Sequence, residues 1–199
     1  MNKKIILGII FGILSLSFIA FMFSNSKLNK MYEFVTLLES GHYYLDGSYS
    51  ILGIETPIKI AVDGNDFDVE TNTFIGSTRL ILMGGNAYLL NNNELTISLI
   101  TETDEAFLGL SDMVIDYSKY KKIGQGESKL PYNEDNSYYP YYEYENVDNG
   151  SVIRYYFKDN ELYCIYVKDQ FVDHMIIINE LTKEIPKDRL RLPEDYMEI

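Results

Sequence analysis

One stretch decides the fold: residues 58–70 read IKIAVDGNDFDVE. Apolar residues alternate with polar or small ones on both sides of Asp63-Gly64-Asn65. Alternation with a period of two is typical of a strand that buries one face. Glycine and asparagine suit a tight hairpin turn because both tolerate positive φ. The stretch therefore predicts a β-hairpin with one face in a core and the other in water.

Further strands are expected on both sides of this hairpin, because similar runs recur between clusters of turn residues. The predicted strands outside the hairpin are residues 43–52, 78–83, 86–90, 95–99, 141–147, 152–157, 162–167 and 172–178. Short turns join most of them, so sequence neighbours are expected to pair antiparallel. A sheet of about ten strands has to curl, and its apolar face needs a cover.

Two helices are predicted as that cover, since apolar residues recur at helical spacing in residues 27–40 and 104–117. The inner stripe of the second helix contains Phe107, Leu110 and Val114. Two helices are too few to cover both faces of the sheet, but they can fill the hollow of a bent one. The expected fold class is mainly β (α+β): a curved antiparallel sheet around one or two helices. Phe107, Leu110 and Val114 are expected to plug its cavity.

Two further segments show no strand pattern. Residues 124–140 are polar and rich in turn residues, which predicts a long loop. The tail, residues 184–196, contains Pro186 and Pro193 and is not expected to form a central strand.

Residues 1–26 are expected to form an N-terminal signal anchor. Residues 5–23 carry no charge, and a helix of this length spans roughly 28 Å. Two lysines precede the run, so the positive-inside rule leaves the N-terminus in the cytoplasm and places residues 27–199 outside the membrane. The alternative is a signal peptide cleaved near Ser26, followed by secretion.

Composition excludes some functions of the exported domain. The chain has 17 basic and 30 acidic residues, a net charge of −13. Nucleic acids and polybasic contacts with lipid headgroups are therefore disfavoured as partners. The single cysteine, Cys164, cannot form a disulfide within the chain and is expected as a small buried side chain.

No motif for catalysis stands out, and the chain is not expected to be an enzyme. There are only two histidines, His42 and His174, each expected in a structural or surface role. The sequence contains neither a Gly-x-Ser-x-Gly elbow nor a nucleotide-binding glycine pattern. Residues 63–68 are similar to the start of a calcium loop, but the later ligand positions do not match, so a hairpin turn with a solvated acidic face is expected. No cofactor or metal ion is predicted.

The most unusual local feature is the tyrosine run at residues 138–144, which read YYPYYEY. One interpretation is an edge strand whose alternate tyrosines pack in the core. The other is a recognition patch for a protein or a glycan, because tyrosine gives a large contact area with few rotatable bonds. The residues of this candidate patch are Tyr138, Tyr139, Tyr141, Tyr142 and Tyr144.

The C-terminal third resembles the LolA-like proteins, the bacterial lipoprotein-carrier superfamily. The predicted strands from residue 141 to residue 178 lead into residues 184–196, which read EIPKDRLRLPEDY. Members of the superfamily often close in this way, with a proline, a large apolar residue, Leu-Pro and an aromatic residue, here Leu192-Pro193 and Tyr196. The helix that leads into a β-meander also fits the layout of the family over residues 28–196.

The resemblance implies an incomplete, or half, β-barrel that wraps around helices in the bacterial cell envelope. It also implies two functions. The first is a membrane-tethered, extracytoplasmic binding or scaffolding module that engages an envelope protein. The alternative is a carrier or sensor of lipid or lipoprotein acyl chains in the concave apolar face. An uncleaved anchor at residues 5–23 favours the module, because a carrier has to diffuse.

Overall fold

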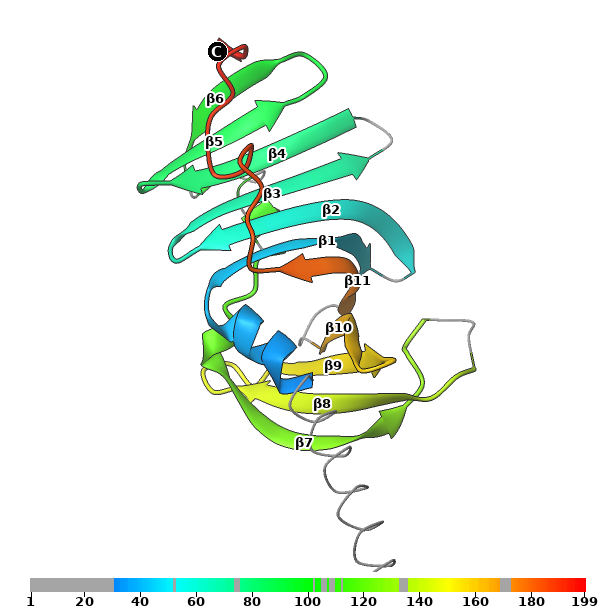
Figure 1. Ribbon diagram of the computed structural model, residues 1–199. Coiled ribbons are helices and arrows are strands. Elements are labelled where there is room, and N and C mark those ends of the chain that lie inside the picture. The colour runs from blue at the N-terminus through cyan, green and yellow to red at the C-terminus, as the bar shows by residue number, and fades with distance from the viewer. Residues whose placement is uncertain are drawn as a thin grey trace, which may run out of the picture.

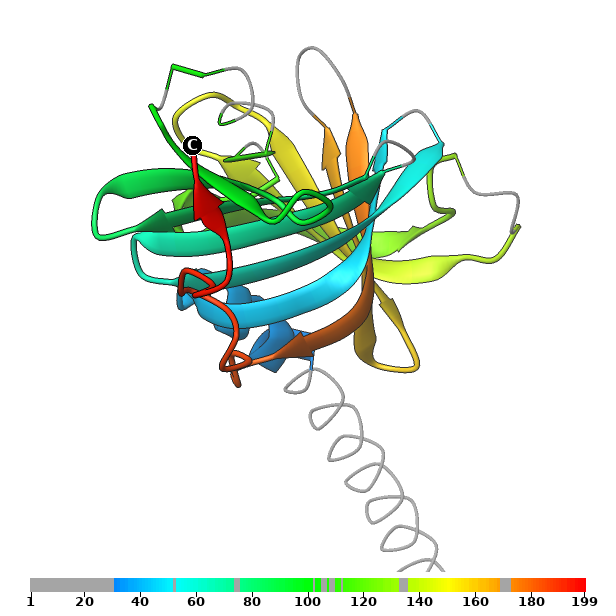
Figure 2. The same cartoon turned by 90° about the horizontal axis from the view of Figure 1, so that it is seen from above.

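A long curved sheet dominates the protein, and a helix lies against one of its faces (Figures 1 and 2). The computed structural model describes the following residues: 31–51, 53–73, 76–101, 103–104, 107, 110–111, 113–132, 136–168 and 173–199. The predicted anchor at residues 5–23 lies outside them. Within the described part of the chain, no helix has the length and apolar character needed to cross a membrane.

The described sheet has twelve strands in the order β12-β6-β5-β4-β3-β2-β1-β11-β10-β9-β8-β7. The first meander comprises β1 (His42–Ile51), β2 (Ile54–Asp63), β3 (Asp66–Thr73), β4 (Gly76–Met83), β5 (Asn86–Asn91) and β6 (Thr96–Ile100). The remaining strands are β7 (Tyr120–Ser128), β8 (Tyr139–Asn146), β9 (Val152–Lys158), β10 (Glu161–Lys168), β11 (His174–Thr182) and β12 (Met197–Glu198). The mainly β, curved and antiparallel fold predicted from the sequence is confirmed. One pair departs from it, because β12 runs parallel to β6.

The central hairpin forms as predicted. Asp63 pairs with Asp66 across the turn, and Gly64 has a φ of 63°. Alternate residues of β3 then point to opposite faces, Val69 into the main core and Asp68 away from it.

Strands β7–β11 form a second meander, and the pairing of β1 with β11 joins the two meanders into one sheet. Their register shifts between Asp46 and Gly47. A Cβ atom at Gly47 would collide with the carbonyl oxygen of Ile177, so only glycine lets the two strands approach here.

The helix is described over residues 31–39, within the predicted range 27–40. Met31, Val35 and Leu38 are buried against the sheet at helical spacing. We call the face that contacts this helix the inner face, and the opposite one the outer face. The inner face forms the main core, so the half-barrel wraps around this helix as expected.

The second predicted helix, residues 104–117, is wrong at its C-terminal end. Phe107, Leu110 and Ser111 are helical, but residues 113–116 are not. A separate 3₁₀ turn, η1 (Tyr117–Lys119), follows instead. The side chain of Asp116 accepts a hydrogen bond from the Ser118 N–H and so caps this new turn.

The predicted loop at residues 124–140 is wrong in its first part, because β7 extends to Ser128 and pairs with β8. β7 is the last strand of the sheet, and no residue of the main core's buried cluster comes from Lys121–Ser128. It therefore lacks the apolar alternation that marks the other strands. Residues 129–132 and 136–138 are not strand.

The C-terminal tail forms no central strand, as its prolines predicted, and it crosses the outer face of the first meander (Figure 1, red). Leu192 and Tyr196 pack against Ile81, Leu90 and Ile97. The tail then ends at β12, on the outer edge of β6.

Candidate functional site

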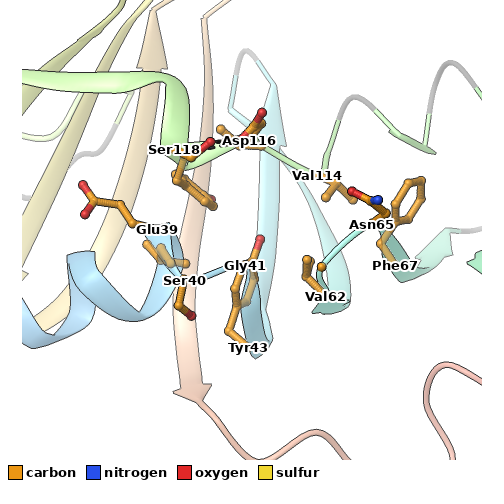
Figure 3. Close-up of a pocket in the computed structure, with 14 residues that line it drawn as sticks. Glu39, Ser40, Gly41, Tyr43, Val62, Asn65, Phe67, Val114, Asp116 and Ser118 are labelled. Carbon is orange, nitrogen blue, oxygen red and sulfur yellow. Dashed lines mark hydrogen bonds between the residues drawn. The ribbon is translucent and has the colours of Figure 1, made fainter.

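A cavity of about 460 Å³ lies in the hollow, between the end of the helix, the start of the first meander and the segment that leads into β7 (Figure 3). Its wall combines apolar side chains with hydroxyl, amide and carboxylate groups. The residues that line it include Leu38, Glu39, Tyr43, Val62, Asn65, Phe67, Val114, Ile115, Asp116, Tyr117 and Ser118.

Two tyrosines form the floor of this cavity. Tyr43 and Tyr117 are 2% and 3% exposed, and their ring centroids lie 6.1 Å apart in an edge-to-face arrangement. Burial raises the pKa of both phenols well above the usual value, and for Tyr43 the carboxylate of Asp116 adds to the effect. Both side chains are therefore neutral at physiological pH. The hydroxyl of Tyr43 points toward the segment that carries Asp116 and Ser118 (Figure 3).

A second cavity, of about 720 Å³, lies on the other side of the same segment. Val114, Ile115 and Asp116 line both cavities. Polar groups contribute much of the wall of the second one, including Asn146, Asn149, Ser151 and His174. The segment thus divides the hollow into two mixed polar and apolar compartments. Such walls suit hydrogen-bonded side chains better than a long hydrocarbon chain.

The acids at the first cavity are placed for binding contacts. The Asp116 carboxylate accepts hydrogen bonds from the backbone and the hydroxyl of Ser118 and lies 3.7 Å from the Lys119 ammonium. Partial burial raises the pKa of Glu39. Both side chains are exposed enough for a ligand to reach them.

The structure brings the three residues of the predicted plug to the inner face. Leu110 is buried in the main core, while Phe107 and Val114 are partly buried and pack against it. The ring centroid of Phe107 lies 6.4 Å from that of Phe67 on β3. These side chains fill part of the hollow beside the two cavities, and their role as a plug stays a prediction.

The tyrosine run is divided between the two faces. Tyr142 and Tyr144 belong to the main core, whereas Tyr139 and Tyr141 lie in a separate cluster on the outer face. Tyr138 is 66% exposed. A strand has a period of two, so residues 138–144 cannot present all five rings on one surface.

The edge-strand interpretation of this run is wrong in one respect, because β8 lies between β7 and β9. Its alternate tyrosines do pack, as that interpretation required. A partner contact by Tyr138, Tyr139, Tyr141, Tyr142 and Tyr144 stays a prediction, and Tyr138 presents the most surface for it.

Sequence reasoning missed a buried ion cluster on the outer face. Asp68 was expected on the solvated face of the hairpin, but it is fully buried. Its carboxylate accepts hydrogen bonds from Arg79 and Arg189 and from the Leu190 N–H. Arg189 also pairs with Glu70 at 2.6 Å. Arg189 lies 121 residues after Asp68, so no local pattern could have indicated the contact.

The two histidines and the cysteine contact other residues of the fold or are buried in it. The Nδ1 atom of His42 lies 3.0 Å from an Asp63 carboxylate oxygen at the surface. The imidazole of His174 lies 5.4 Å from the ring centroid of Tyr49. Cys164 is fully buried, which raises the pKa of its thiol.

Comparison with known proteins gives no sequence family, since no family model and no curated protein matches the chain. Solved structures with a similar arrangement include an uncharacterised conserved protein from Thermus thermophilus (9% identity, TM-score 0.45), of which 98% is covered along with 88% of this chain. MucB is 10% identical at a TM-score of 0.44, with 86% of this chain and 63% of MucB covered. MucB in complex with MucA(peri) gives 10% identity and a TM-score of 0.41, with 88% of this chain and 61% of MucB covered. The chain thus spans somewhat less than two thirds of MucB, and its resemblance to the lipoprotein-carrier superfamily stays a prediction.

Proposed function

We propose that this protein is a membrane-tethered, extracytoplasmic binding module of the cell envelope, that it engages a protein partner, and that it catalyses no reaction. The observation that supports this most is the divided hollow, in which side chains of the chain itself separate two cavities with mixed polar and apolar walls. The inner face of the sheet buries Val35 and Leu38 of the helix. It also buries Leu110, which lies between β6 and β7. A carrier needs a hydrocarbon channel in this place.

The walls that remain accessible favour a polypeptide as the ligand. The walls of both cavities contain apolar groups and hydrogen-bonding groups side by side. In the first cavity, Tyr43, Asn65 and Asp116 supply hydrogen-bonding groups. A hydrocarbon chain gains free energy from apolar surface, at about 0.8 kcal/mol per buried CH₂, and would leave such groups without partners. A protein side chain can pack and hydrogen-bond at once.

The proposed location rests on the sequence of residues 1–26, with its uncharged run after two lysines. Protease treatment of intact cells lacking outer barriers tests it. We expect residues 27–199 to be degraded without lysis. Protection until lysis would contradict the extracytoplasmic assignment.

A carrier or sensor of acyl chains is the second candidate. The observation in its favour is the apolar part of the first cavity, where Leu38, Val62, Phe67, Val114 and Ile115 contribute side chains. A short acyl segment could lie against them. This candidate requires the lipid to be bound at one copy per chain.

Site-specific photo-crosslinking in the producing organism tests the binding function. A photoreactive amino acid at Ser118, an exposed residue at the first cavity, is expected to capture one envelope protein. The matched control places it at Lys187, which is exposed on the tail. The captured protein is then purified, and its affinity for the wild-type chain is measured directly.

Three outcomes contradict the proposal. One is capture of lipid in place of protein at Ser118. The second is a captured protein whose purified form shows no binding, and the third is equal capture at Lys187. A Tyr43→Ala variant sharpens the result, since it removes part of the cavity floor and should weaken a genuine complex.

A further inference from the structure

The two edges of the sheet differ in how they end. The outer edge of β6 is covered by the chain itself, because the N–H groups of Met197 and Ile199 donate to the carbonyls of Leu95 and Ile97 at 2.9 and 3.0 Å. At the opposite end, β7 runs for nine residues (Figure 1). No described strand pairs with its outer edge. Every second residue of such an edge presents a free N–H and C=O for another strand.

The charges of β7 are distributed in a self-complementary way. Its first half carries Lys121 and Lys122, and its second half carries Glu127. If two copies of β7 lie antiparallel, the first half of each strand lies beside the second half of the other. Lys122 and Glu127 both lie on the inner face, because they pair with Tyr144 and Pro140 of β8. Lys122 of each copy then faces Glu127 of the second copy, twice by symmetry.

The middle of β7 favours close approach. Gly124 and Gly126 flank Gln125 and add no bulk between the strands. Ile123 is 53% exposed, although it is an apolar residue of a strand. Pairing about this centre would cover Ile123 in both copies, with a gain of about 25 cal/mol for each Å² of apolar surface removed from water.

Charge also limits which strand can bind here. The chain carries −13 overall, so two copies repel each other over most of their surfaces, whereas β7 itself carries a net charge of +1. Lysines and a β-bulge, here between Lys122 and Gly124, discourage pairing with unrelated strands. When the second strand is β7 itself, each Lys122 faces a Glu127, which offsets the repulsion between the two lysine-bearing edges.

We propose that two copies of this chain associate through β7, in a two-fold symmetric, antiparallel strand pair that continues the sheet from one copy into the other. Lys122 is already ordered for this, since its ammonium donates to the Tyr32 hydroxyl at 2.7 Å and lies 3.7 Å from the Tyr142 ring centroid. Lys121 lies on the outer face and takes no part in this contact. This association is independent of the binding function proposed above.

Disulfide crosslinking of the full chain in its membrane tests the geometry. Gln125→Cys places an exposed thiol near the two-fold axis, and mild oxidation is expected to give a crosslinked dimer. Asn72→Cys, exposed on β3, is the matched control and should remain uncrosslinked. The unaltered chain is a second control, because Cys164 is fully buried. No dimer with Gln125→Cys, or equal crosslinking at both positions, overturns the proposal.

Charge exchange tests the register in the Gln125→Cys background. Lys122→Glu leaves only acids in this contact, and Glu127→Lys leaves only lysines, so each is expected to lower the crosslinked fraction about fivefold to thirtyfold. Mixing the two variants restores complementary charges and should restore crosslinking between them. Neither position lies in the core, so folding is retained. Unchanged crosslinking in both single variants, or no recovery on mixing, would refute the antiparallel pair.

Discussion

The two halves of the sheet close their outer faces by different means. Over the first meander the C-terminal tail is attached through charges, with Asp68 between Arg79 and Arg189. Over β8–β11 the cover is apolar and aromatic. Leu130 packs there in a buried cluster with Tyr139, Tyr156, Cys164, Tyr166 and Met175. A strand can therefore be buried on both faces in either way, but the two solutions should fail differently.

An ion cluster and an aromatic cluster differ in what a deletion leaves behind. Removal of one buried ion leaves its partners charged and without compensation in a medium of low polarity. Removal of an apolar side chain leaves a cavity, whose cost depends on how far the neighbours relax. The first meander should consequently be the more sensitive half to single changes on its outer face.

The largest effect is expected for Asp68→Ala. Two buried guanidinium groups, those of Arg79 and Arg189, lose their common carboxylate, and the free energy of unfolding should fall by about 3–5 kcal/mol. Urea unfolding of residues 27–199 measures the change. Asp195→Ala, an exposed acid of the same tail, is the control and should alter the stability by less than about 0.5 kcal/mol. Equal effects of the two changes would show that the tail is not held through Asp68.

A smaller loss is expected for Leu130→Ala in the other half. Leu130 is 4% exposed and covers Tyr156 and Cys164 on the outer face. Its truncation should cost about 3 kcal/mol and leave a cavity. The same unfolding measurement applies. A cost above that of Asp68→Ala would reverse the comparison between the two halves.

High pH should act mainly through the inner tyrosines. Burial raises the pKa of Tyr117 and Tyr155 in the folded protein, whereas unfolded tyrosine titrates near about 10. Above about pH 10 the folded state therefore binds more protons than the unfolded state, so stability falls as the pH rises and is unaffected below it. Absorbance titration of the phenols followed with far-UV circular dichroism measures this. Free titration of all the tyrosines near pH 10 without loss of structure would contradict their burial.

The smallest effect is expected for Tyr155→Phe. The hydroxyl of Tyr155 is buried and has no hydrogen-bond partner among the described residues, so its removal should change the free energy of unfolding by about 1 kcal/mol or less, in the stabilising direction. Tyr166→Phe is the matched comparison, because the Tyr166 hydroxyl donates to Asp173 at 2.6 Å. It should lose about 1.5–3 kcal/mol. Loss at Tyr155 equal to that at Tyr166 would indicate a partner for the Tyr155 hydroxyl.

The sequence predicts the sheet because most of its strands bury one or both faces, and burial imposes alternation or apolar runs. β7 was not predicted, because its residues lie at the edge of the sheet and outside the buried cluster, so its sequence shows no such pattern. The contact between Asp68 and Arg189 could not be predicted either. It depends on the path of the C-terminal tail over the sheet, and only the complete sheet determines that path.

The candidate site shows the same division. Leu110 was expected in the hollow from its helical spacing, and it is buried there. The position of Val114 between two cavities could not be predicted, since the helix ends before it and the cap at Asp116 redirects the chain. The run at residues 138–144 was unusual in composition, but a period of two had already assigned its rings to opposite faces.

Lipid content measured on residues 27–199, purified without detergent, tests most directly whether the hollow binds a hydrocarbon chain. Organic extraction followed by quantitative mass spectrometry gives the number of acyl chains per protein, with the Val62→Trp variant as a control that narrows the first cavity. Leu110 and the helix fill part of the inner face, and polar groups line the cavities that remain. We therefore expect far less than one acyl chain per protein and no difference between the two forms. One acyl chain per wild-type protein that is lost in Val62→Trp would contradict the binding module and establish a carrier.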